Sequence, residues 1–209
     1  MKSTRIFGAV AVAALLAGAG AATCLARASG PTVTPIDLGT LGGTSSFAHA
    51  VNASGQVVGE SWTAAGQIHA FSWTQAGGMV DLGTIGGNVS HATAVNSSGQ
   101  VVGESQITVG GTSHAFSWTQ AGGMVDLGTL GGTSSGAVGV NARGQVVGSS
   151  DIASPGVSHA FSWTKAGGMI DLGSLGGTFA SATAVNARGD VIGDSTTADG
   201  GFHATLWHT

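Results

Sequence analysis

The sequence is poor in residues that often stabilise small exported domains. It contains one cysteine, Cys24, three prolines and no tyrosine, and only 8% of its residues are charged. A single cysteine cannot form an intramolecular disulfide, so the fold depends on a packed hydrophobic core. Beyond residue 28 no segment shows the apolar periodicity of a helix, and the 38 glycines of the chain disfavour helices of useful length.

Positive charge is also scarce. Residues 29–209 contain three basic residues, Arg143, Lys165 and Arg188, and all ten acidic residues of the chain, which gives a net charge of −7. A chain with this balance lacks the basic surface that binds nucleic acid or an anionic membrane. We therefore expect neither partner.

The first 28 residues have the pattern of a secretory signal peptide. A basic start is followed by an uncharged, apolar stretch from Ile6 to Leu25 and by small residues up to Ala28. This order predicts export and cleavage, so we expect a secreted protein, either extracellular or periplasmic. Two alternatives are an uncleaved membrane anchor and lipidation at Cys24, although Thr23 is not the small residue that bacterial lipoprotein processing prefers before the cysteine.

Residues 29–209 form one domain of four repeats, each about 45 residues long. Three motifs recur at steps of 44 or 45 residues. The motif DLGT or DLGS begins at Asp37, Asp81, Asp126 and Asp171; the motif HA begins at His69, His114, His159 and His203; and the pair VN begins at Val51, Val95, Val140 and Val185. The agreement of these registers predicts a tandem repeat architecture.

Each repeat is predicted to contain four short antiparallel strands. In residues 91–129 the segments AVN, QVVGES, HAFSWT and MVDLGT are rich in strand-forming residues and are separated by glycine-containing turns. We name them strands a, b, c and d. The predicted fold class is therefore all-β, and each repeat has the size of one β-propeller blade.

The ends of the domain predict ring closure. Residues 33–40 have the sequence of a lone strand d, whereas residues 179–208 contain strands a, b and c only. Pairing these two segments completes a fourth blade, so we expect a monomeric four-bladed β-propeller of four-stranded blades, the last closed by the N-terminal strand. The alternatives are an open β-solenoid and a half-ring that dimerises.

The string HAFSWT…GGMVDLGTLGG followed by AVNxxGQVVGxS resembles the HAF family of bacterial extracellular repeat proteins. The naming motif stands at His69–Phe71, His114–Phe116 and His159–Phe161, whereas the fourth copy departs from it as His203-Ala204-Thr205. The resemblance covers essentially all of residues 29–209. It implies export and repetition, and it brings no catalytic residue or ligand.

The repeated polar and aromatic residues are predicted to be structural, because a side chain present in every repeat occupies the same structural position each time. The aspartates of the DLG motif are expected to accept hydrogen bonds from nearby backbone amides. The histidines of the HA motif alternate along strand c with four tryptophans that are expected to pack between blades. These tryptophans are Trp73, Trp118, Trp163 and Trp207. No catalytic residue is predicted.

The turn NxxGQ between strands a and b faintly resembles a calcium loop, as in Asn52 to Gln56. Its alternate positions hold Asn, Ser or Arg rather than the carboxylates that calcium prefers, and a hairpin with glycine at positive φ explains the string without a metal. We therefore expect no metal ion and no other cofactor.

All length variation lies in the loop between strands b and c, which shares one edge of the blades with the connections from d to a. Loops on a rigid scaffold commonly carry binding function. We therefore predict that any ligand binds at this edge, through Phe47, His49, Trp62 and His91. The expected function is non-catalytic binding of an extracellular glycan or protein; a structural, surface-associated role is the alternative, and a hydrolase or lyase is the most distant one.

Overall fold

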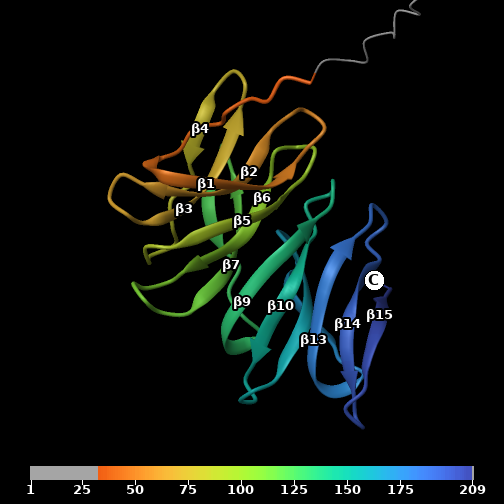
Figure 1. Cartoon of the computed structure of the whole chain (residues 1–209). Helices are drawn as coiled ribbons and strands as arrows, with labels where there is room; N and C mark the ends of the chain where they lie inside the picture. Colours follow the sequence, from red (N-terminus) through yellow and green to blue (C-terminus); the bar gives the residue numbers. More distant parts are fainter. Residues whose placement is uncertain (1–32, 209) are drawn as a thin grey trace, which may run out of the picture. The chain divides into compact units, whose positions relative to one another are not determined.

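The computed structural model describes residues 33–208, so the predicted signal peptide and Cys24 lie outside the described residues. The chain divides into two units, Met1–Ile36 and Asp37–Thr209. In the first unit, the described residues Val33–Ile36 are exposed and form no regular element. In the second unit, all the regular secondary structure that is described consists of β-strands (Figure 1), which confirms the all-β class.

The described residues form fifteen strands. Repeat 1 contains β1 (Gly42–Val51), β2 (Val57–Thr63), β3 (Ile68–Thr74) and β4 (Gly78–Asp81). Repeat 2 contains β5 (Ser90–Val95), β6 (Val101–Gln106), β7 (Ser113–Thr119) and β8 (Gly123–Asp126). Repeat 3 contains β9 (Gly131–Val140), β10 (Val146–Ile152), β11 (Ser158–Thr164) and β12 (Gly168–Gly173). Repeat 4 contains β13 (Gly176–Val185), β14 (Val191–Thr197) and β15 (Phe202–Trp207).

Within each repeat, strands that follow one another in the chain pair antiparallel, and the hairpins hold them in register. Repeats 1 and 2 are separate four-stranded sheets, while a parallel bridge between Ser158 and Phe179 joins repeats 3 and 4 into one seven-stranded sheet. The four-stranded repeat predicted from the sequence is therefore confirmed for the first three copies.

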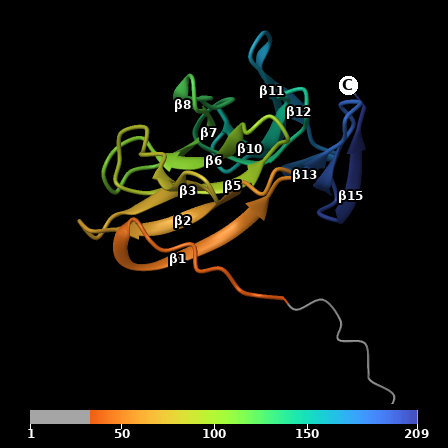
Figure 2. The same cartoon turned by 90° about the horizontal axis from the view of Figure 1, so that it is seen from above.

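The predicted closed propeller is wrong. The three sheets are open, β15 pairs with β14 alone, and the described residues 33–40 form no strand (Figures 1 and 2). In repeats 1 to 3, strand d is attached to strand c by a short hairpin, whereas residues 33–40 could reach β15 only by closing a loop of nearly the whole domain, which costs more entropy. In addition, Pro35 stands where repeat 1 has Met79 and cannot donate a backbone hydrogen bond to a neighbouring strand.

The core lies between consecutive repeats rather than inside any one of them. Val58, Ala70 and Leu82 of repeat 1 pack against Ala92, Val101 and Phe116 of repeat 2, and all are buried. Two further clusters join repeat 2 to repeat 3 and repeat 3 to repeat 4 at equivalent positions. No such cluster in residues 33–208 joins repeat 4 to repeat 1. Each repeat is therefore stabilised by its neighbours in the chain, as in solenoid proteins.

Candidate functional site

The four side chains predicted to bind a ligand do not form a single site. Phe47 on β1 and Trp62 on β2 lie together, with ring centroids 6.1 Å apart in an edge-to-face arrangement, and Phe47 is 52% exposed. His49 and His91 are already hydrogen-bonded between repeats. The Nδ1 atom of His49 lies 2.9 Å from the carbonyl oxygen of Ala92, and Nδ1 of His91 pairs with the carboxylate of Glu60.

The repeated histidines and aspartates form one pair in each complete repeat. Nδ1 of the histidine lies 2.9 Å from a carboxylate oxygen of the aspartate twelve residues later, as in His69 with Asp81, His114 with Asp126 and His159 with Asp171. The same aspartates, and Asp37, accept a hydrogen bond from the glycine amide two residues later. These contacts attach strand c to the turn after strand d. His203 on β15 makes no side-chain hydrogen bond to any residue that the structure describes.

The repeated tryptophans are partly buried at the other edge of each sheet. Trp118, Trp163 and Trp207 pack against the three clusters between repeats, and Trp73 is partly exposed in repeat 1. A partly exposed indole gives an apolar surface beside polar neighbours, which suits both packing and ligand contact.

The edge of the sheets that carries the b–c loops and the d–a connections is called the loop edge here. It contains a pocket between repeats 2 and 3, with a volume of about 320 Å³, lined largely by serines and by Glu104 and Asp151. Two of its six serine hydroxyls, those of Ser135 and Ser150, are hydrogen-bonded to other residues. Ser135 accepts a hydrogen bond from the Ala115 amide and donates one to the Gly128 carbonyl, and Ser150 accepts one from the Leu130 amide. These hydroxyls hold the connection from strand d to strand a, so they have little capacity left for a ligand.

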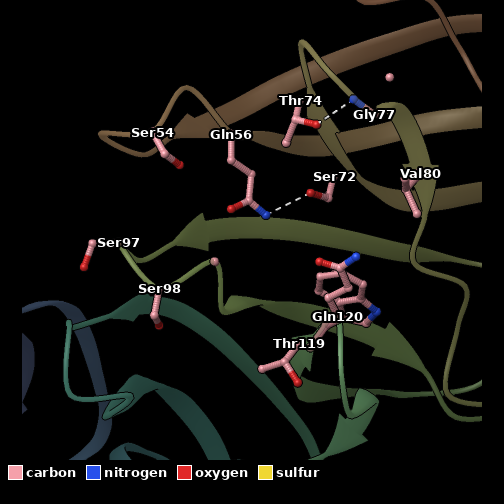
Figure 3. A pocket seen from close by; sticks show the side chains of 13 residues that line it. Ser54, Gln56, Ser72, Thr74, Gly77, Val80, Ser97, Ser98, Thr119 and Gln120 are labelled. Atoms are coloured by element: carbon pink, nitrogen blue, oxygen red, sulfur yellow. Dashed lines mark hydrogen bonds between the residues drawn. The ribbon is translucent and has the colours of Figure 1, made fainter.

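The turn edge, where the a–b and c–d turns lie, contains a larger pocket between repeats 1 and 2 (Figure 3). Its volume is about 400 Å³, and its lining includes Trp118, Thr119 and Gln120 of repeat 2. Gln56 and Ser72 line the opposite side, where Nε2 of Gln56 donates to Oγ of Ser72 over 2.9 Å. An indole, amides and hydroxyls thus surround a space of ligand size.

Equivalent pockets recur at the next two junctions. The pocket between repeats 2 and 3 has a volume of about 480 Å³ and is lined by Gln100, Ser117 and Trp163, which correspond to residues of the first pocket. The pocket between repeats 3 and 4 has a volume of about 340 Å³ and is lined by Gln145 and Ser162. The three turn-edge pockets therefore follow the repeat. Sequence reasoning missed them because it searched where the copies differ, whereas these pockets form where the copies agree.

A ladder of asparagines fixes the turns beside these pockets. In each NxxGQ turn, the side-chain oxygen of the asparagine accepts backbone amide hydrogens of its own turn, and the following glycine has positive φ, as in Gly99 at 83°. The asparagine Nδ2 donates to the asparagine carbonyl of the next repeat, from Asn52 to Asn96, from Asn96 to Asn141 and from Asn141 to Asn186. The ladder sets the spacing of successive turns and therefore of the pockets.

All basic residues of the described chain lie along this edge. Arg143 and Lys165 line the pocket between repeats 2 and 3, and Arg143 and Arg188 line the next one. Arg188 pairs with Asp190 over 3.2 Å. Hydrogen bonds from Asn186 and His208, with the nearby Arg188 charge, lower the pKa of Asp190 to about 2, so this carboxylate stays ionised. Arg143 and Lys165 form no ion pair with a described residue.

Metal ligands do not converge in the described residues: no three His, Cys, Asp or Glu side chains lie close enough together to hold an ion. Nor do residues 33–208 contain a helix with the length and apolarity needed to cross a membrane. No protein-family profile and no curated protein matches the sequence.

Proposed function

We propose that the protein is a secreted, non-catalytic module of HAF-type repeats that binds an extracellular polysaccharide carrying anionic groups. The observation that supports this proposal best is the recurrence of one pocket type at three successive repeat junctions, with the three Lys and Arg residues of the described part of the chain placed in two of them. The signal-peptide pattern of residues 1–28 supports the proposed export.

The lining chemistry suits sugars. A sugar ring has apolar C–H faces and a rim of hydroxyl groups, so it fits beside a partly exposed indole such as Trp163 with amide and hydroxyl neighbours such as Gln100 and Thr164. Repeated pockets also suit a polymer of repeated units. Each pocket alone can bind weakly, while engagement of two or three by one chain raises the overall affinity.

The charge distribution points to an acidic polymer. The net charge of −7 over residues 29–209 repels anions at long range, yet Arg143 and Lys165 expose uncompensated charge at the turn edge. A guanidinium group binds carboxylate or sulfate with two parallel hydrogen bonds, which gives both strength and orientation. The pocket between repeats 1 and 2 has no charged lining residue and suits a neutral part of the same chain.

The same lining supports binding rather than hydrolysis. None of the residues that line the three turn-edge pockets is an aspartate, a glutamate or a histidine. Glycoside hydrolases generally place two carboxyl groups on either side of the bond that they cleave. The pockets offer no such pair, so the hydrolase alternative has no support at this edge.

Loss of positive charge at the turn edge is expected to weaken binding of an acidic polysaccharide. In the double variant R143Q/K165Q, affinity for polygalacturonate should fall about tenfold or more, because each charge-assisted hydrogen bond contributes about 1.5–3 kcal/mol. Affinity electrophoresis and calorimetry at two salt concentrations measure this change, and the wild-type affinity should fall as salt rises. The single variant R188Q should have a smaller effect, since Asp190 already offsets the Arg188 charge.

Trp62→Ala is the matched control for the other edge, since Trp62 belongs to the predicted loop-edge site. It should leave polygalacturonate binding unchanged. If W62A abolishes binding while R143Q/K165Q has no effect, the ligand binds at the loop edge and the turn-edge proposal is wrong. Absence of binding to any acidic or neutral polysaccharide would overturn the glycan proposal and favour a protein partner.

A further inference from the structure

Every repeat has two different faces. The leading face contacts the preceding repeat; in repeat 2 it includes Ala92, Val101 and Phe116. The trailing face contacts the following repeat; in repeat 1 it includes Val58 and Ala70. All three core clusters join the trailing face of one repeat to the leading face of the next, so a single interface design is used three times.

The trailing face of repeat 4 is uncovered in the described structure. Ile192 is 50% exposed, whereas the equivalent Val58, Val102 and Val147 are 0% exposed. Leu206 on β15 is 53% exposed, and the two side chains line a hollow of about 380 Å³. The free edge of β15 borders this face. Repeat 4 therefore presents the surface that the other repeats bury against a neighbour.

The leading face of repeat 1 is partly uncovered, although Phe71, the equivalent of Phe116, is only 1% exposed. Val51 is 65% exposed, whereas its equivalents Val95, Val140 and Val185 pack against the core clusters. Ala48 is exposed, whereas its equivalents Ala92, Ala137 and Ala182 are at most 1% exposed. The two open faces of the chain thus correspond to the two halves of the interface between repeats.

Polar groups beside these faces are also complementary. Three histidine–aspartate pairs link strand c to the turn after strand d, while His203 in repeat 4 and Asp37 before repeat 1 are both exposed and make no such pair with a described residue. Asp37 belongs to the segment 33–40, which has the sequence of strand d and forms no strand. Repeat 4 therefore has the histidine of the pair without its aspartate, and the segment before repeat 1 has the aspartate without its histidine.

We infer that the protein assembles head to tail, with the trailing face of repeat 4 in one copy bound to the leading face of repeat 1 in a second copy. Residues 37–40 of the second copy, which follow Pro35, then lie beside the free edge of β15, where its Asp37 pairs with His203 of the first. The contact continues an interface that the chain already uses three times. It is heterologous, so it generates rings or filaments rather than a two-fold dimer. It replaces the expectation of a monomer, which rested on ring closure within one chain.

The test uses two variants of the full chain that each block one face. I192K places a charge on the trailing face, V51K places one on the leading face, and both positions are at least half exposed, so folding is preserved. V109K is the matched control, because Val109 is 74% exposed in the loop between β6 and β7. In sedimentation velocity, the wild type and V109K should shift to larger species as concentration rises, while I192K and V51K should each sediment as monomers.

Mixing the two blocked variants gives the decisive result. I192K keeps an intact leading face and V51K an intact trailing face, so an equimolar mixture should form a dimer that grows no further. A two-fold interface cannot be restored in this way by variants on different faces. A wild-type chain that stays monomeric at every concentration, or a mixture of blocked variants that stays monomeric while the wild type associates, overturns head-to-tail assembly.

Discussion

Gly148→Ala is expected to cost about 3 kcal/mol or more in the free energy of unfolding, because backbone and not a flexible side chain occupies the space that the methyl group needs. A Cβ atom on Gly148 would lie 1.9 Å from the carbonyl oxygen of Gly136 on the paired strand. The pairing of β9 with β10 is irregular at this point, which brings the two backbones close. Denaturant unfolding measures the change as a lower midpoint.

Gly136→Ala is the matched control on the opposite strand. An added Cβ there meets only the end of the Glu104 side chain at 3.1 Å, and repeats 1, 2 and 4 hold Phe47, His91 and Ser181 at the same position. Its stability should change by less than about 0.5 kcal/mol. Equal stability of the two variants would show that β9 and β10 are not held this closely in solution. Gly103→Ala should repeat the Gly148 result, since its Cβ would lie 1.9 Å from the His91 carbonyl oxygen.

Asn141→Ala is expected to cost about 3 kcal/mol, because it leaves several partly buried polar groups without partners at about 1–3 kcal/mol each. Asn141 is 5% exposed. Its Oδ1 accepts the amides of Arg143 and Gln145 over 3.0 and 3.1 Å, and its Nδ2 donates to the Asn186 carbonyl over 3.0 Å. Hydrogen exchange should show faster exchange in the turns of repeats 3 and 4 than in that of repeat 1.

Asn186→Ala provides the comparison at the end of the ladder. Asn186 is exposed and donates within its own turn to Asp190, and water can replace its contacts. The cost should be about 1 kcal/mol or less. If both asparagine variants lose the same stability, only the hydrogen bonds within each turn stabilise it. The hydrogen bond to the turn of the next repeat then contributes nothing. A larger loss for N141A shows that the ladder couples the repeats that form the turn-edge pockets.

These variants bear on function because the turn-edge pockets are built from residues of adjacent repeats. Trp163 of repeat 3 faces Gln100 and Ser117 of repeat 2 across one pocket, so a change in the junction changes the site. A binding surface of this kind depends on the regular stacking of repeats. N141A should therefore also weaken polysaccharide binding, although Asn141 does not line any of the three pockets.

Much of the local structure could be predicted from the sequence. The strands of repeats 1 to 3 and their turns follow from residues close together in the chain, such as Asn96 with the amide of Gln100 and Asp81 with the amide of Gly83. The candidate site was harder to predict. Of the four loop-edge residues, His49 and His91 form hydrogen bonds to the next repeat or to the preceding one, and no local pattern reveals a partner more than thirty residues away.

The amino-acid sequence by itself determined the all-β class, the four repeats, the strand order within each repeat and the position of the glycine turns. These features depend on side-chain alternation and on hydrogen bonds within a few residues, so each repeat encodes them separately. Only the tertiary structure decided that the ring stays open, that the pockets lie at the turn edge and that Ile192 and Val51 remain exposed. These features depend on the angle and spacing at which one repeat packs on the next. A small change in that angle accumulates over the three junctions and determines whether the first and last repeats meet.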